Sequence, residues 1–197
     1  VEMYGLRFDS TRTTNLARTP SGATSSKAYT WSAWVKRTKL GTQQCLISAG
    51  TDASTKIDSI EFGTNNFLDV YSYDGMYIYN YTTNQAFTDD KWIHLIVSVD
   101  TTITAPNDRL KIYVDGVRQT SFLNSAEPPL DSDLKFFNNN VAQNIGYQLS
   151  RRGNDSYMSD VYMVDGLALD PSVFGTDYEG KWAPYDLSLI HISEPTR

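Results

Sequence analysis

The chain has 197 residues, a formal net charge of −6 and an aromatic content of 13% that includes 13 tyrosines. An acidic chain lacks the basic face that phosphates require, which argues against nucleic acid as a partner. No run approaches the ~20 apolar residues of a transmembrane helix, so we expect no membrane insertion. The one cysteine, Cys45, excludes an internal disulfide and is expected to be buried at the start of an apolar strand.

Short apolar strands separated by turn residues follow one another along the chain. Residues 124–133 contain Pro128 and Pro129 and are expected to form a loop, whereas residues 171–174 suit one helical turn that starts at a proline. About twelve short strands with regular turns and no long helical period predict a β-sandwich or jelly roll. Outside the two hairpins described next, strands are expected at residues 4–8, 15–18, 29–36, 45–49, 57–62, 134–137, 142–149 and 157–164.

The central hairpin is expected at residues 92–116. Alternation with a period of two places the apolar residues of each strand on one face of a sheet. Asp115 and Gly116 predict a tight turn, because both positions of such a turn need positive φ, and residues 117–120 then begin the return strand. The apolar positions of the two strands are Ile93, Leu95, Val97 and Val99, and Leu110, Ile112 and Val114.

A second hairpin is expected at residues 67–82, around Asp74 and Gly75. A two-residue turn would place Tyr73 opposite Met76. One face of this hairpin would then pack on the core, and the other would form an exposed aromatic patch of the kind that marks a contact site. Alternatively, a loop or a neighbouring subunit covers the second face. The two predicted faces are Tyr71, Tyr73, Met76 and Ile78, and Leu68, Val70, Tyr77, Tyr79 and Tyr81.

Several blocks of the sequence share a family pattern. Trp92 and His94 form W-x-H, which L-x-I-Y-V-D-G follows at residues 110–116. This pattern resembles laminin-G-like domains of the concanavalin A-like lectin and glucanase group. The resemblance implies an all-β fold, a concanavalin A-like jelly-roll β-sandwich of two antiparallel sheets. Further blocks that match it are residues 6–8, 29–36, 145–146 and 157–175, so that the resemblance spans roughly residues 5–185.

The last residues, 187–197, form a separate case. Their sequence, LSLIHISEPTR, resembles the in-frame translation of a transposon-type sequencing adapter. We therefore expect a single laminin-G-like domain at residues 1–186, as a fragment of a longer protein from an environmental assembly. Residues 187–197 are expected to lie outside the fold.

The glucanases of the same group carry their acids on one strand as E-x-D-x-x-E, which places all three on one face. This sequence has no such string, and Asp58 and Glu61 are expected on opposite faces of one strand, where they cannot flank one glycosidic bond. His94 occupies the W-x-H position and is expected to be a hydrogen-bonded structural residue. We therefore predict that the chain is not an enzyme.

Calcium is the one cofactor that the sequence leaves open. Hard cations take several oxygen ligands from loops, and many laminin-G-like and lectin domains hold such an ion at one rim of the sandwich. Acidic loop residues also act simply as turn formers. The candidates for a calcium site are Asp52, Asp74 and Asp100, with Asn154 and Asp155 as further possibilities.

The predicted function is recognition of a glycan or a cell-surface polysaccharide. Aromatic faces would stack on sugars, and polar loop side chains would bind their hydroxyls. Such residues occur in the second hairpin and in the exposed loop at residues 150–156, which we expect to lie together. The candidate ligand-binding residues are Tyr73, Tyr77, Tyr79, Arg151, Arg152, Asn154 and Asp155.

The full set of blocks resembles laminin-G-like domains in virion proteins of environmental phages, of the tail-fibre or capsid-decorating type. This resemblance implies a location in a virion or outside the cell. It also allows a structural role in which the aromatic patch contacts other virion subunits and binds no sugar. A third interpretation is a module of a secreted bacterial adhesin.

Overall fold

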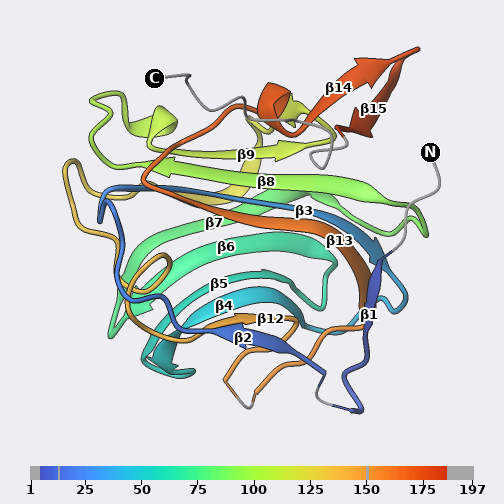
Figure 1. Ribbon diagram of the computed structural model, residues 1–197, viewed down its shortest axis with the longest axis horizontal. Coiled ribbons are helices and arrows are strands. Elements are labelled where there is room, and N and C mark those ends of the chain that lie inside the picture. The colour runs from blue at the N-terminus through green and yellow to red at the C-terminus, as the bar shows by residue number, and fades with distance from the viewer. Residues whose placement is uncertain (1–4, 13, 150, 186–197) are drawn as a thin grey trace, which may run out of the picture.

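The computed structural model of the chain describes residues 5–12, 14–149 and 151–185. Within these residues two antiparallel sheets face each other (Figure 1). The six-stranded sheet has the order β1 (Leu6–Phe8), β13 (Ser156–Asp165), β3 (Ala28–Arg37), β8 (Ile93–Asp100), β9 (Leu110–Val114) and β10 (Val117–Arg118). The seven-stranded sheet has the order β11 (Phe122–Ala126), β7 (Tyr77–Ala86), β6 (Phe67–Asp74), β5 (Lys56–Phe62), β4 (Gln44–Asp52), β12 (Gln143–Ile145) and β2 (Leu16–Arg18).

The remaining elements are two short 3-10 helices, η1 (Pro106–Asp108) and η2 (Pro171–Val173), and the small hairpin of β14 (Gly175–Tyr178) and β15 (Lys181–Pro184). None of the helices in the described residues is long and apolar enough to cross a membrane. The predicted helical turn near residue 171 is confirmed, and so is the all-β sandwich of two antiparallel sheets.

The core lies between the two sheets and follows the predicted alternation. Tyr29 and Trp31 of β3 point into it and are fully buried, together with Leu95 and Val97 of β8. Trp31 pairs with Val97, and the alternate residues of both strands point to the opposite face. Cys45 is also buried, as expected. Burial of these large apolar side chains supplies the main stabilising free energy of the fold.

The outer face of the six-stranded sheet is covered by the C-terminal segment, residues 167–185 (Figure 1). Thr30 Oγ1 donates to the Leu167 carbonyl at 2.7 Å and accepts from the Leu169 amide at 2.8 Å. Phe174 packs there against Ile96 and other apolar residues. The centre of this sheet is therefore covered on both faces, and a polar residue of its outer face, Thr30, holds the covering segment by hydrogen bonds.

The predicted turn of the central hairpin is confirmed. Asp115 and Gly116 have φ values of 49° and 77°. A Cβ atom on Gly116 would lie 2.5 Å from the ring of Trp182. Glycine is therefore required here both by the backbone conformation and by the close approach of the C-terminal hairpin.

The hairpin of β6 and β7 has a different register from the predicted one. Tyr73 pairs with Tyr77 instead of Met76, and Ser72 pairs with Tyr79, with an irregularity between the two pairs. The turn is longer than two residues, which the local sequence does not reveal. As a result Tyr77 leaves the core-facing side on which Tyr79 lies.

Two strand predictions are also wrong. Residues 122–126 form β11, which pairs with β7 at the edge of the seven-stranded sheet. Residues 134–137 form no strand, yet Leu134, Phe136 and Phe137 are buried in the core. Their apolar character therefore reflects burial in a loop. The predicted adapter-like tail at 187–197 lies outside the described residues.

Candidate functional site

Three tyrosines gather on the outer face of the seven-stranded sheet, where β6 turns into β7. The ring centroids of Tyr73 and Tyr77 lie 5.0 Å apart at 73°, and those of Tyr71 and Tyr77 lie 6.0 Å apart at 90°. Tyr77 is 57% exposed and the neighbouring Met76 is 68% exposed. Edge-to-face packing thus orients the Tyr77 ring while leaving more than half of the residue in contact with solvent.

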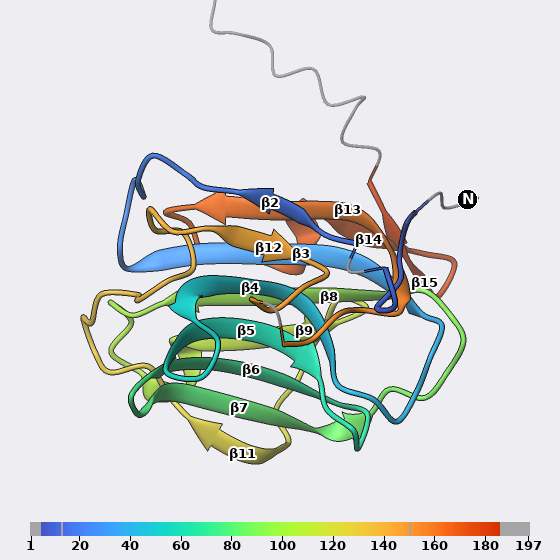
Figure 2. The same cartoon turned by 90° about the horizontal axis from the view of Figure 1, so that it is seen from below.

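The loop between β12 and β13 reaches the same face. Two backbone hydrogen bonds join the loop to β4. At its start the Gly146 amide donates to the Leu46 carbonyl at 2.8 Å, and near its end the Cys45 amide donates to the Gly153 carbonyl at 3.0 Å. Figure 2 shows this segment passing beside β4 on the side turned to the viewer. Gly146 has a φ of 79°, and a Cβ atom there would lie 2.1 Å from the ring of Phe8. The loop is therefore fixed at both ends.

Beneath this loop, Glu61 of β5 collects hydrogen bonds on the outer face. Gln148 Nε2 donates to Glu61 Oε2 and to Tyr71 Oη, both at 2.9 Å, and Arg152 forms an ion pair with Glu61. Burial, together with the charge of Glu61, raises the pKa of Tyr71 above its ordinary value. A buried carboxylate is stable only when it is paired and hydrogen-bonded. Glu61 therefore holds the loop onto the sheet.

These contacts bring the second hairpin and the 150–156 loop together. Arg152 Nη1 lies 3.4 Å from Tyr71 Oη. Arg151 Nη1 donates to the Ala53 carbonyl at 2.8 Å, and the Gly75 amide donates to the carbonyl of the nearby Thr55 at 2.9 Å. We call the resulting region the tyrosine surface, which consists of Tyr71, Tyr73, Met76, Tyr77, Arg151 and Arg152.

Three of the predicted ligand-binding residues lie elsewhere. Tyr79 is 1% exposed and faces the core on the same side as Leu68 and Val70, and its Oη lies 3.4 Å from that of Tyr29. Asn154 is also 1% exposed and donates to Ser156 Oγ at 2.7 Å. These two side chains cannot contact a ligand in the folded protein.

Asp155 has a structural role. Its carboxylate accepts hydrogen bonds from the amide of Ser10 at 3.0 Å and from the Ser10 hydroxyl at 2.7 Å. It therefore connects the loop to the segment that follows β1. Conversely, Tyr71, Glu61 and Gln148 were absent from the predicted set, although the spacing of Tyr71 and Tyr73 already placed them on one face.

The predicted calcium ligands do not form a site. Asp52 accepts from the amides of Ser54 at 2.7 Å and Thr55 at 3.0 Å, and Asp100 accepts from that of Thr102 at 2.9 Å. Asp52 and Asp74 belong to the seven-stranded sheet, whereas Asp100 belongs to the other sheet. Calcium needs six to eight oxygens around one point. In the part of the chain that the structure describes, no group of three or more His, Cys, Asp or Glu side chains could hold a metal ion.

One pair of carboxylates, Glu61 and Asp69, does lie on one face of the seven-stranded sheet, but the two residues belong to neighbouring strands. Glu61 is the register partner of Asp69 on β6, whereas Asp58 points to the core side. Glu61 is 2% exposed and is paired with Arg152. Asp69 accepts from Thr82 Oγ1 at 2.7 Å, and burial raises its pKa. Because Glu61 has no free approach from solvent, the pair does not have the access that glycoside hydrolysis requires.

The sequence profile of the concanavalin A-like lectin/glucanases superfamily matches residues 10–164. No curated protein matches the sequence significantly. Solved structures of low identity share the fold. One is a candidate carbohydrate-binding protein of Bacteroides ovatus, with 18% identity, a TM-score of 0.57 and coverage of 95% of this chain and 52% of that one.

Two further similar structures are binding domains. The CBM40 of a Ruminococcus gnavus sialidase, bound to α2,3-sialyllactose, has 11% identity, a TM-score of 0.52 and coverage of 82% and 95% of the two chains. The binding domain of botulinum neurotoxin serotype D has 11% identity, a TM-score of 0.55 and coverage of 87% and 44%. The chain thus spans about half the length of the Bacteroides and neurotoxin chains.

Proposed function

The chain belongs to the concanavalin A-like lectin/glucanases superfamily, and we propose that it is a non-catalytic module that binds carbohydrate. The exposed, oriented Tyr77 ring beside Tyr73 is the observation that carries this proposal. The similar folds of a candidate carbohydrate-binding protein and of a module bound to sialyllactose support it.

Binding would use the two kinds of group on the tyrosine surface. The exposed face of Tyr77 would stack on the C–H face of a sugar ring, which buries apolar area on both partners, and Tyr73, inclined at 73° to it, would contact the sugar from the side. Arg151, an exposed residue beside them, would donate hydrogen bonds to sugar hydroxyls or to a carboxylate. The ligand would be a glycan or a cell-surface polysaccharide, and the protein would act in a virion or outside the cell.

A glycan-array assay on the full chain tests this proposal, run once with calcium and once with a chelator. We expect binding to at least one glycan class in both conditions, because the predicted calcium ligands do not form a site. The variant Tyr77→Ala should abolish that binding with little change in thermal stability. A folded wild-type protein that binds no glycan would contradict the proposal.

A second candidate function is a structural role in a phage virion. The adjacent exposure of Met76 and Tyr77 favours it, because such residues are common at subunit interfaces. In that case the purified protein would self-associate in sedimentation experiments, and Tyr77→Ala would make it a monomer. A glycan-binding monomer would argue for the first function, whether in a virion protein or in a secreted bacterial adhesin.

A further inference from the structure

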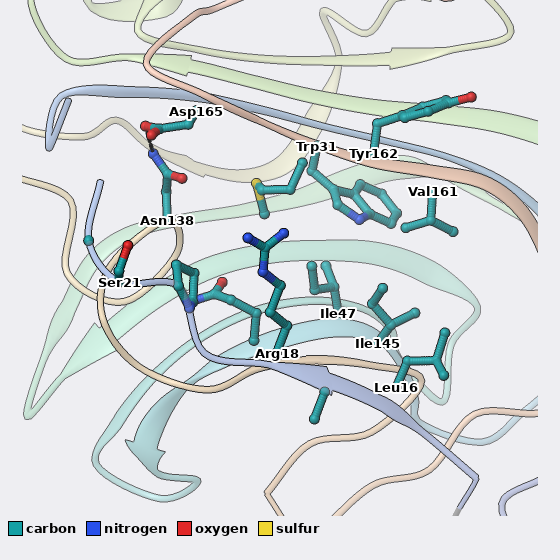
Figure 3. Close-up of a pocket in the computed structure, with 15 residues that line it drawn as sticks. Leu16, Arg18, Ser21, Trp31, Ile47, Asn138, Ile145, Val161, Tyr162 and Asp165 are labelled. Carbon is teal, nitrogen blue, oxygen red and sulfur yellow. Dashed lines mark hydrogen bonds between the residues drawn. The ribbon is translucent and has the colours of Figure 1, made fainter. Parts of the chain in front are cut away.

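A cavity of about 400 Å³ opens between the two sheets, at the edge where β2 and β12 face β13 (Figure 3). One part of its wall is apolar, with Ile47 and Ile145 from the seven-stranded sheet and Val161 and Met163 from β13. The bulge in β13 after Ser159 turns the odd-numbered residues inward at this point. The volume lies in the range of small-molecule sites, which is roughly 300–1,000 Å³.

Three of the residues that line this cavity have a polar group without a partner among the described residues. Trp31 Nε1 and Gln143 Oε1 are both buried and lack a hydrogen bond. Arg18 extends from the edge strand β2 into the space between the two sheets (Figure 3), and its guanidinium has no carboxylate or carbonyl partner among the described residues.

The carboxylate that lines the cavity, Asp165, does not form an ion pair with Arg18. Asp165 accepts hydrogen bonds from the Thr24 amide at 2.6 Å and from Asn138 Nδ2. It is therefore already satisfied at the far end of the cavity (Figure 3). Arg18 thus leaves a positive charge without a counter-charge at the mouth of the cavity.

We propose that this cavity binds a small amphipathic carboxylate. The carboxylate would pair with the Arg18 guanidinium through charge-assisted hydrogen bonds. The hydrocarbon part would fill the space among Ile47, Ile145 and Met163. The cavity lies between the two sheets, whereas the tyrosine surface lies on the outer face of the seven-stranded sheet, so the two sites are separate.

Calorimetric titration of the full chain with octanoate and with 1-octanol tests the proposal. The two ligands share a hydrocarbon chain and differ in charge. We expect octanoate to bind more tightly, and Arg18→Gln to weaken octanoate binding by roughly tenfold or more while leaving 1-octanol binding unchanged. The matched control is Arg7→Gln, since Arg7 is an exposed arginine of β1 that does not line the cavity. This control should bind octanoate as the wild type does.

The ¹H–¹⁵N resonance of the Trp31 indole locates the ligand independently of any arginine variant. The resonance is assigned by its loss in Trp31→Phe, and octanoate should shift it more than it shifts the indole signals of Trp34, Trp92 and Trp182. No octanoate binding, or binding that is insensitive to Arg18→Gln and leaves the Trp31 signal in place, would overturn the proposal. Because octanoate carries no sugar, neither result depends on the proposed glycan function.

Discussion

Trp182 Nε1 donates a hydrogen bond to His94 Nδ1 at 2.8 Å. This contact fixes the tautomer of the histidine, because Nδ1 must then be unprotonated and Nε2 must carry the proton. Nε2 lies 2.8 Å from Ser32 Oγ, to which it donates. The ring is also stacked on Trp34, with centroids 4.9 Å apart. The predicted structural role of His94 is thus confirmed, and its neutral form connects the C-terminal hairpin to the six-stranded sheet.

The first prediction concerns the stability of the protein at acidic pH. Burial lowers the pKa of His94 from 6.5 to about 4. The unfolded chain therefore takes up the proton more readily than the folded protein does. The contribution of His94 to the free energy of unfolding is complete above pH 6.5 and is lost as the pH falls toward 4, by a total of about 3 kcal/mol. Urea unfolding at a series of pH values measures it.

The control for this experiment is His94→Gln, which cannot take up a proton. Asp58 changes in the opposite sense over the same range, because burial raises its pKa to about 6. Its contribution is present at low pH and is lost as the pH rises through 6. Only the difference between the wild type and His94→Gln isolates the histidine. A difference that stays constant between pH 7 and pH 4 would contradict the prediction.

The second prediction concerns the hairpin of β14 and β15. Trp182→Phe keeps an aromatic ring at this position but removes the donor, so that His94 Nδ1 loses its partner. An unsatisfied buried acceptor costs about 1–3 kcal/mol, and we expect the free energy of unfolding to fall by that amount. In this variant the hairpin should also exchange its amide hydrogens faster than it does in the wild type, whereas exchange in β3 should not change. Unchanged stability and unchanged exchange would show that the hydrogen bond contributes nothing.

The third prediction concerns the ion pair beneath the loop. In Arg152→Met the carboxylate of Glu61 stays buried without its charge partner, which is expected to cost about 3–5 kcal/mol. The double variant Glu61→Gln with Arg152→Met should recover most of this loss, because it removes both charges. Thermal unfolding of the single and double variants compares them. A double variant as unstable as the single one would mean that the loop depends on another contact.

The sequence predicts the faces of the strands better than it predicts the turns. Alternation is a local property, so Leu95 faces the core and the adjacent His94 lies on the opposite face of β8, as the pattern of residues 93–99 predicts. The register of β6 and β7 depends on a turn whose length is not encoded by the Asp74–Gly75 pair alone. For that reason the sequence places Tyr77 on the face of Tyr79, although in the structure only Tyr79 faces the core. β11 was missed because Pro128 and Pro129 suggested a loop, although both follow the end of the strand at Ala126.

The candidate site was only partly predictable for a related reason. The exposed Tyr77 and the arginines of the 150–156 loop have the composition of a contact surface, which a sequence reveals. Their meeting depends on Glu61, which lies 91 residues from Arg152 in the chain. No local pattern specifies such a long-range ion pair. For the same reason, the cavity beside Trp31 could not be anticipated from the edge strand that closes it.

The last prediction separates binding from stability with two tyrosines of one strand. Tyr77 and Tyr79 lie two residues apart on β7, and they are 57% and 1% exposed. Tyr77→Ala removes a surface ring and should change the free energy of unfolding by less than about 1 kcal/mol. Tyr79→Ala leaves a cavity in the core and should destabilise the protein by about 3–5 kcal/mol.

The same two variants give opposite results in a binding assay at a temperature where both are folded. Tyr77→Ala should lose glycan binding because the exposed ring is gone, whereas Tyr79→Ala should retain it because the tyrosine surface is intact. Tyr79→Phe is the milder control, since it keeps the core volume and removes only the hydroxyl near Tyr29. If Tyr77→Ala bound glycan as well as the wild type did, the ligand would have to lie away from the tyrosine surface.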